Sequence, residues 1–424
     1  MKDLFKRIIS DFQKSDLPQL QTREIEIPLN SGKIITLTGC RRTGKTYLFY
    51  QIIRSLLKKT KIESIIYINF EDERLNLSTS DLDLMIEAYY ELHPAKKAEI
   101  WFFFDEIQNV EGWEKFVRRI YDTVSKNIFI TGSSSKLLSK EIATSLRGRT
   151  LAYEVFPFSF KEFLKAKNID SVDKYSTIGK SGIVSALNEY LQSGGFPETT
   201  NLSSELKTKT LQSYFDVMLY RDLIERNNIS NTAALKYFIK KGISNTGNKF
   251  SVNKVYNELK SLGIKISKDT LYSFIEHVHD AFILFPVNMF SESITSQSSG
   301  EKKLYCIDNG LANAVSFKFS EDRGRMLENL VYLHLRRTNH EIYYNKGKGE
   351  CDFVIKNREQ YSLYQVTKEV NRTNEKREIN GLVEAMDKFD TKEGYIITEG
   401  QKKEIKTGRK KIHIIEAREF LIQD

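Results

Sequence analysis

Short apolar runs alternate with amphipathic segments along the first 130 residues. The runs at 34–38, 64–70, 100–104 and 127–132 are almost continuously apolar or β-branched, so they predict strands. Residues 46–58 space their apolar side chains as one face of a helix does. Strands that alternate with helices and are apolar on both faces indicate a parallel sheet covered by helices on its two sides. This part of the chain is therefore predicted to be α/β.

The pattern changes on either side of this region. Residues 1–22 predict a helix with a break at Pro18. Residues 160–228 carry few strand signals and predict mainly helices, whereas residues 302–424 return to a mixture of helices and strands. The basic run 401–411 is expected to form a hairpin that either contacts phosphates or is simply solvated.

Residues 230–290 predict three short helices followed by an apolar strand. The last two helices begin at Ser251 and Ser267, and Gly263 lies in the turn between them, as a helix-turn-helix requires. Four lysines of this segment could bind DNA phosphates: Lys254, Lys260, Lys265 and Lys268. The alternative is a packing module, because acidic residues in the second helix weaken any reading of bases.

Composition narrows the class of protein. Of 424 residues, 40% are hydrophobic and 29% are charged, which is the balance of a globular chain rather than a disordered one. We find no run of the ~20 apolar residues that a membrane helix needs. Cys40, Cys306 and Cys351 are too few and too far apart for a disulfide framework or a paired-cysteine zinc site. We therefore expect a cytoplasmic protein without a membrane partner, and its net charge of +9 allows a polyanionic partner without requiring one.

One segment carries a phosphate-binding pattern. Residues 39–46 fit G-x-x-x-x-G-K-[ST] between a predicted strand and a predicted helix. Glycines let backbone amides approach phosphate oxygens, and the helix N-terminus adds a positive dipole. Lys45 is expected to neutralise phosphate charge and Thr46 to bind Mg²⁺. The predicted nucleotide-binding residues are Gly39, Cys40, Arg41, Arg42, Thr43, Gly44, Lys45, Thr46 and Tyr47.

Two further strands end in polar residues that could complete this site. Asp105 follows the third strand and is expected to hold Mg²⁺, while Glu106 polarises the attacking water. Ser133, after the fourth strand, could sense the terminal phosphate. Arg147 and Arg149 could reach a phosphate in a neighbouring subunit as an arginine finger does, which would make the protein a homo-oligomer.

Together these motifs resemble an AAA+-related archaeal and bacterial P-loop ATPase family, STAND-like, that joins its ATPase core to a winged-helix segment and a C-terminal nuclease-like domain. The resemblance rests on residues 39–46, 67–75, 102–114, 130–139, 145–150, 156–164, 194–198, 220–227, 325–337 and 349–355. It implies an α/β fold in four parts: an ATPase core (1–165), a helical lid (166–228), a winged helix (229–292) and a nuclease-like domain (293–424). It also implies ATP and Mg²⁺ as cofactors, and a lid proline near the nucleotide, which is Pro197 here.

The nuclease-like pattern departs from the family at one position. Glu328, Asp352 and Gln365 match a helix glutamate, a strand aspartate and the first residue of E/Q-x-K on the next strand. Thr367 stands where the family has lysine, and Lys368 points to the opposite face of the strand. Hydrolysis of a phosphodiester needs clustered carboxylates and a lysine near the attacking water. The pattern therefore favours a retained fold used for binding or assembly over an active nuclease.

Three functions remain open from the sequence. The first is a Mg²⁺-dependent ATPase that acts on DNA, in remodelling, branch migration or defence. The second is a STAND-like nucleotide switch with a protein partner, which changes shape with the bound nucleotide. The third and weakest is an ATP-regulated nuclease.

Overall fold

The structure is a computed structural model that describes residues 1–94, 99–133, 144–169, 177–293, 295, 297, 300–316, 322–338 and 341–423. The chain divides into two compact units, Met1–Val155 and Phe156–Asp424. Within the described residues, no helix is both long enough and apolar enough to cross a membrane.

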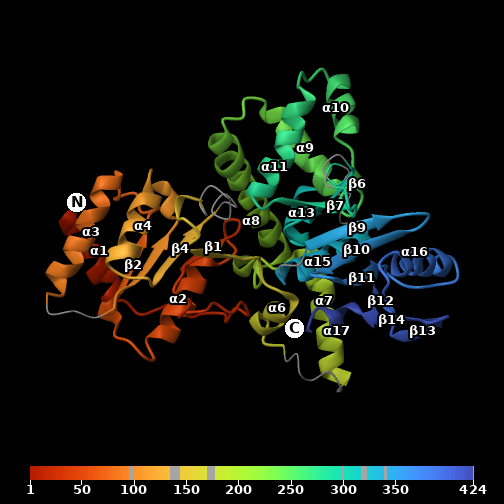
Figure 1. The fold of residues 1–424 in the computed structure, drawn as a ribbon, viewed down its shortest axis with the longest axis horizontal. Coiled ribbons are helices and arrows are strands. Elements are labelled where there is room, and N and C mark those ends of the chain that lie inside the picture. The colour runs from red at the N-terminus through yellow and green to blue at the C-terminus, as the bar shows by residue number, and fades with distance from the viewer. Residues whose placement is uncertain are drawn as a thin grey trace. The chain divides into compact units, whose positions relative to one another are not determined.

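The first unit contains a five-stranded parallel sheet in the order β2-β3-β4-β1-β5. The sheet lies between α2 on one face and α3 and α4 on the other (Figure 1). The bounds of its elements are α1 (Lys2–Lys14), β1 (Ile34–Thr38), α2 (Lys45–Leu56), β2 (Ile65–Asn69), α3 (Leu82–Leu92), β3 (Trp101–Asp105), α4 (Trp113–Thr123), β4 (Ile128–Gly132) and β5 (Thr150–Glu154).

Alternation along the strands builds the two cores of this unit. Phe103 and Phe129 pack with α2, whereas Phe102, Phe104 and Ile130 pack with α3 and α4. The prediction of an α/β parallel sheet covered on both faces is confirmed. The sequence analysis missed β5, whose residues are partly or fully exposed and lack a continuous apolar run because this strand lies at the edge of the sheet.

The second unit begins with helices, as predicted. These are α6 (Phe160–Ala166), α7 (Thr177–Ser193), the short 3-10 helix η5 (Pro197–Thr199), α8 (Ser204–Val217) and the π-helical turn η6 (Met218–Glu225).

A helix-turn-helix follows, flanked by three strands. Its elements are α9 (Thr232–Ser244), β6 (Lys249–Phe250), α10 (Val252–Ser261), α11 (Lys268–Asp280), β7 (Leu284–Met289) and β8 (Lys302–Cys306). Ser251 and Ser267 cap α10 and α11 through their side chains, and Gly263 takes a left-handed conformation (φ +75°) in the turn between them. The strand β8 pairs antiparallel with both β7 and β6. The predicted helix-turn-helix is confirmed.

The strands β6, β7 and β8 continue into the C-terminal part of the chain as one mixed nine-stranded sheet, in the order β13-β14-β12-β11-β10-β9-β7-β8-β6 (Figure 1). The winged-helix assignment of residues 229–292 stays a prediction. The strands β7 and β9 join the two parts by parallel pairing of Asn288 with Tyr343. The remaining elements are α13 (Asn309–Val315), α15 (Arg323–Arg337), β9 (Glu341–Lys346), β10 (Glu350–Asn357), β11 (Gln360–Val366), α16 (Glu375–Lys388), β12 (Glu393–Thr398), β13 (Lys403–Thr407), β14 (Lys410–Glu416) and α17 (Ala417–Phe420).

Two sequence expectations bear on this sheet. The basic run near residues 401–411 forms the β13–β14 hairpin, as expected. The expected boundary after residue 292 lies in the connection between β7 and β8, which pair with each other. The division of the chain into four domains stays a prediction.

Candidate nucleotide-binding site

The strand order of the first unit brings three strand ends together. The strand β4 lies between β1 and β3, and the carboxyl ends of all three point to the same edge of the sheet. The loop of residues 39–44 follows β1 at this edge. A Cβ on Gly39 would lie 2.2 Å from the carbonyl oxygen of Val155, so only glycine fits there. Gly44 has φ +92° and starts α2, whose first residues include Lys45 and Thr46.

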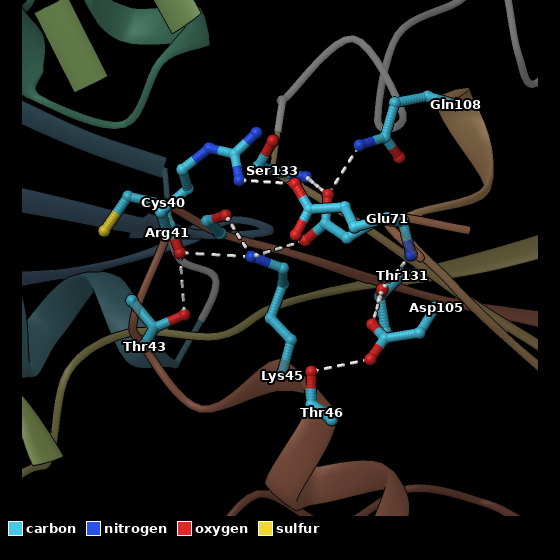
Figure 2. Close-up of polar contacts among 12 residues, drawn as sticks. Cys40, Arg41, Thr43, Lys45, Thr46, Glu71, Asp105, Gln108, Thr131 and Ser133 are labelled. Carbon is cyan, nitrogen blue, oxygen red and sulfur yellow. Dashed lines mark hydrogen bonds and ion pairs between the residues drawn. The ribbon is translucent and has the colours of Figure 1, made fainter. Parts of the chain in front are cut away.

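Lys45 is buried, with 5% of its surface exposed, and points into the loop. Its Nζ donates to the carbonyl oxygens of Gly39 (3.1 Å) and Cys40 (3.2 Å) and lies 3.3 Å from Glu106 Oε1 (Figure 2). Thr43 Oγ1 donates to the same Cys40 oxygen at 3.0 Å. The ammonium group is therefore held by one carboxylate and by the loop's own carbonyls.

Three side-chain hydroxyls donate hydrogen bonds to the carboxylate of Asp105 at the end of β3. Thr46 Oγ1 donates to Asp105 Oδ2 at 2.6 Å, Tyr67 OH donates to the same oxygen at 3.0 Å, and Thr131 Oγ1 donates to Asp105 Oδ1. Burial raises the pKa of Asp105, although the hydrogen bonds from the two threonines oppose this shift. A hydroxyl and a carboxylate that meet at this distance are oxygen ligands of the kind that Mg²⁺ takes, so Thr46 and Asp105 fit the ion that the family implies.

Glu106 is buried beside this cluster, in a left-handed conformation with φ +52°. Its Oε2 accepts hydrogen bonds from Gln108 Nε2 (2.5 Å) and from the backbone N–H of Ser133 (3.2 Å). Burial alone would raise its pKa, but Lys45 and the Gln108 hydrogen bond outweigh burial, and the pKa falls below its ordinary value. Glu106 is thus a buried carboxylate whose charged form is stabilised by Lys45 and Gln108.

The structure assembles the main residues predicted for this site and adds some that the sequence analysis missed. Ser133 contacts Glu106 through its backbone amide, while Thr131 is the residue that bridges β4 to Asp105 and accepts from the Glu106 backbone N–H at 2.9 Å. Arg41 forms an ion pair with Glu71 at 2.6 Å. The position of Glu71, just beyond a parallel strand, was the signal that could have identified it.

The other predicted loop residues differ in exposure. Cys40 and Thr43 are buried, Arg42 is exposed and has φ +68°, and Tyr47 on α2 is 53% exposed. The exposed face of this loop is therefore formed by a cation and an aromatic ring.

The two arginines proposed to act between subunits lie at the opposite edge of the sheet. The carbonyl oxygen of Arg149 accepts from the N–H of Ile34, at the amino end of β1, and its guanidinium pairs with Asp122 at 3.2 Å. Arg147 lies two residues earlier, before β5 begins. Neither is at the phosphate-loop edge of its own sheet. A role in a neighbouring subunit stays a prediction.

Pro197 belongs to the second unit and begins η5. The preceding Phe196 is buried, and the N–H of Gly195 donates to Asp308 Oδ2 at 2.7 Å. The hydrogen bond from Gly195 to Asp308 joins two residues of the second unit. The predicted proximity of Pro197 to a nucleotide stays a prediction.

The nuclease-like positions come together around a lysine that the sequence analysis did not single out. Glu328 Oε1 and Asp352 Oδ1 lie 3.2 and 3.0 Å from Lys303 Nζ. Gln365 bonds to other groups, because its Oε1 accepts from the Asp352 N–H and its Nε2 donates to Glu378. Among the described residues, no group of three metal-binding side chains could hold a metal ion. The residues present therefore do not fit the metal that a nuclease would need.

Three family models match consecutive parts of the chain. An AAA domain model matches residues 31–164, a domain of unknown function (DUF8612) matches residues 184–322, and another (DUF4143) matches residues 323–420. The likeness to solved structures is weak. Caenorhabditis elegans PCH-2 is 15% identical with a TM-score of 0.29, over 48% of this chain and 60% of that one. A chain of the Drosophila ORC bound to AT-rich DNA and Cdc6 is 12% identical with a TM-score of 0.22, over 74% and 93%.

Curated relatives cover most of the chain. The uncharacterized protein MJ1544 of Methanocaldococcus jannaschii is 43% identical over 393 residues, which are 91% of this chain and 86% of that protein. An uncharacterized protein of Haemophilus influenzae is 31% identical over 341 residues, or 80% and 83%. The chain therefore belongs to the same family as MJ1544, and in it an AAA-type P-loop NTPase domain is followed by regions that match DUF8612 and DUF4143.

Proposed function

We propose that this protein is a Mg²⁺-dependent ATPase. The observation that carries the proposal is the convergence of Lys45, Thr46, Asp105 and Glu106 at one edge of the parallel sheet. A phosphate-binding loop, a metal-ligand pair and an ionised carboxylate are the parts that phosphoryl transfer to water needs.

The Lys45–Glu106 ion pair suggests how the site works. Phosphate oxygens of an incoming nucleotide carry more charge than two loop carbonyls, so they compete for Lys45 Nζ. When Lys45 turns to the phosphate, Glu106 loses its cation, its affinity for protons rises, and it becomes available to orient and deprotonate a water molecule. Bound Mg²⁺ would neutralise phosphate charge, with Thr46 and Asp105 as its protein ligands.

The proposal has a direct test in steady-state ATP hydrolysis. We expect Lys45→Ala to lose tight nucleotide binding and Glu106→Gln to bind ATP but hydrolyse it about 10²–10⁴-fold more slowly. GTP serves as a second substrate, because the loop contacts phosphate and does not select the base. Hydrolysis by Glu106→Gln at the wild-type rate would show that another group activates the water.

The same assay addresses assembly. We propose that the protein acts as a homo-oligomer in which Arg149 or Arg147 completes the site of a neighbouring subunit. Arg149→Ala should then lower kcat while leaving ATP binding intact, and hydrolysis per chain should rise with protein concentration. A rate per chain that is independent of concentration, together with an unaffected Arg149→Ala, would refute the shared site.

A second function, nucleic-acid binding, is favoured by the winged-helix arrangement of α9, β6, α10, α11, β7 and β8. Lys254, Lys260, Lys265 and Lys268 are all exposed on α10, α11 and the turn between them. Exposed lysines on such an arrangement can contact DNA phosphates. The exposed Asp269 and Glu276 on α11 weaken base readout, so we expect binding that depends on DNA structure more than on sequence.

ATP hydrolysis in the presence of single-stranded, duplex and branched DNA tests this second function. We expect one DNA form to stimulate hydrolysis, and the stimulation to fall with salt and with alanine at the four lysines. Slow hydrolysis that ignores every DNA form would instead support the nucleotide switch with a protein partner.

A further inference from the structure

A buried lysine of the strand β8 sits among the acidic residues of the C-terminal region. Lys303 is only 2% exposed, and β8 holds its backbone between β7 and β6. The carboxylates around it come from α15 (Glu328) and from β10 (Glu350 and Asp352). Two parts of the nine-stranded sheet therefore meet at one ammonium group.

The three carboxylates use the whole donor capacity of that group. Lys303 Nζ lies 2.8 Å from Glu350 Oε1, 3.0 Å from Asp352 Oδ1 and 3.2 Å from Glu328 Oε1. An ammonium group has three N–H donors, so each can point to a different carboxylate. Other groups also contact these carboxylates: Asp352 Oδ2 accepts from the Val366 N–H at 3.0 Å, Glu328 Oε1 accepts from Tyr305 OH at 2.7 Å, and Glu350 Oε2 lies 3.6 Å from Lys249 Nζ.

The charge around Lys303 shows how strongly the cation is held. Burial would lower the pKa of Lys303, but Glu328, Asp352 and Glu350 outweigh burial and raise it well above the ordinary value. Burial raises the pKa of Glu328 to about 7 even with Lys303 beside it. The carboxylates therefore need a cation at this point, and Lys303 supplies one that is covalently part of the chain.

This position is where the nuclease-like pattern calls for a metal ion. Three carboxylate oxygens lie 2.8–3.2 Å from the Lys303 Nζ, which suits an ammonium group, whereas a divalent cation at that point would draw its oxygen ligands in to about 2.0–2.6 Å. The ion and the ammonium cannot both lie between these oxygens. The position expected to carry the nuclease lysine holds Thr367, whose hydroxyl donates to the Glu369 carbonyl oxygen.

We propose that the Lys303 ammonium takes the place of the divalent cation, so that the cluster of Glu328, Glu350 and Asp352 is a latent metal site closed by an internal cation. The cluster then fastens β6, β7 and β8 to the C-terminal strands and does not hydrolyse phosphodiesters. The inference rests on the second unit alone and is independent of the proposed ATPase.

Lys303→Met tests the proposal because it keeps an unbranched side chain only one atom shorter and removes the charge. Titration of nucleotide-free protein with Mn²⁺ should show one more bound equivalent in Lys303→Met than in the wild type, and the P-loop contribution cancels in the difference. Saturating Mn²⁺ should raise the Tm of the variant by about 5–10 °C relative to EDTA, if the ion is present at about a hundred times its Kd.

Two variants control this experiment. Lys302→Met makes the same change one residue away on β8, where alternation turns the side chain to the other face and Nζ donates to Asn288 Oδ1. It should gain no Mn²⁺ equivalent. Lys303→Met combined with Asp352→Asn should lose the gained equivalent.

Three results would overturn the proposal. One is a wild-type protein that binds Mn²⁺ in a manner abolished by Asp352→Asn, or that cuts DNA with Mn²⁺. Another is a folded Lys303→Met that gains no Mn²⁺ equivalent. If Lys303→Met folds only with Mn²⁺, the proposal is supported. If Lys303→Met folds neither with nor without Mn²⁺, the double variant Lys303→Met, Glu328→Gln replaces it, because it has one uncompensated charge fewer. The third overturning result is a folded double variant that does not bind Mn²⁺.

Discussion

Two buried lysines, Lys45 and Lys303, hold carboxylates in the two units, and they do so differently. Lys45 Nζ has one carboxylate partner, at 3.3 Å, and two loop carbonyls. Lys303 Nζ has three carboxylates within 3.2 Å, all from one helix and one strand of the second unit. Their exposed fractions are 5% and 2%, so burial alone does not distinguish them.

The difference lies in what could replace each partner. Lys45 is held by loop carbonyls and by the carboxylate of Glu106, which has hydrogen bonds of its own. A phosphate can therefore replace these partners of Lys45 at modest cost. Without Lys303, Glu328 and Asp352 would be left as uncompensated charges in a protein interior, while the partly exposed Glu350 would keep Lys249 at 3.6 Å. A buried lysine in this chain is thus exchangeable where it meets carbonyls and fixed where it meets several carboxylates.

The largest effect should come from removing the fixed cation. We expect Lys303→Met, without added metal, to lower the free energy of unfolding of the second unit by about 3–5 kcal/mol, because it strands buried carboxylates. Lys45→Met should cost the first unit much less, because Glu106 keeps its hydrogen bonds from Gln108 and Ser133.

The chain offers a way to read the two units separately. Its two tryptophans, Trp101 and Trp113, are both buried in the first unit. Lys303→Met should therefore shift the urea transition seen by far-UV circular dichroism and leave the tryptophan fluorescence transition in place. Equal losses for the two lysine variants would break the comparison.

The next effect concerns the exchangeable cation. Lys45→Ala should lower kcat/KM for ATP hydrolysis by about 10²–10³-fold, because it removes a charge-assisted donor to the transferred phosphate. Lys303→Met should leave kcat/KM within about twofold, provided that the first unit remains folded by tryptophan fluorescence. A comparable loss in Lys303→Met would mean that the two lysines act on one site.

The sequence predicts the role of Lys45 but not that of Lys303. The spacing of residues 39–46 between a strand and a helix identified Lys45, because a phosphate loop is a local pattern. Lys303 lies in Lys302–Cys306, which resembles the polar start of an ordinary strand, and its partners follow 25 to 49 residues later. The parallel pairing of β7 with β9 brings these segments into one sheet, and hydrophobic periodicity carries no information about such pairing.

The same limit applies within the nucleotide site. The sequence placed Asp105 and Glu106 at a strand end, but the order β2-β3-β4-β1-β5 decides that β4 lies between them and the phosphate loop. That order makes Thr131, rather than the side chain of Ser133, the residue next to Asp105. Thr131 and Ser133 are two residues apart, so which of them lies beside Asp105 depends on the register of β4 against β3, where Phe104 pairs with Ile130. The ends of strands are the least certain part of a sequence-based prediction.

Asp308 is a buried carboxylate that is held by backbone amides rather than by a lysine, so it can be compared with the carboxylates around Lys45 and Lys303. It accepts from the N–H groups of Gly195 and Leu311, yet burial raises its pKa from 3.8 to about 6. Between these values the folded chain binds a proton that the unfolded chain does not. The resulting stabilisation is complete below pH 4 and is lost as the pH rises through 6.

We therefore expect the wild type to gain about 2–3 kcal/mol of stability relative to Asp308→Asn when the pH falls from 7 to 4. Urea titrations of both proteins at several pH values, followed by far-UV circular dichroism, measure this difference. Taking the difference between the two proteins removes the contribution of the other carboxylates to the pH dependence, because both proteins contain them. A stability difference that is flat from pH 4 to 7 would show that Asp308 stays ionised when buried.

The smallest effect should come from a hydroxyl at the edge of the exchangeable site. Tyr67 OH donates to Asp105 Oδ2 at 3.0 Å, on the same oxygen as Thr46, and does not touch Lys45. Tyr67→Phe removes one neutral hydrogen bond to Asp105, worth about 1 kcal/mol. Because Asp105 is the expected Mg²⁺ ligand, the apparent Mg²⁺ requirement of ATP hydrolysis should rise about fivefold, while kcat at saturating Mg²⁺ stays the same.

Tyr50→Phe is the matched control, since its hydroxyl donates to Tyr67 OH at 3.4 Å and not to Asp105. A fall in kcat at saturating Mg²⁺ would instead place Tyr67 in the chemical step, and the cluster around Asp105 would then not be a simple metal-holding device.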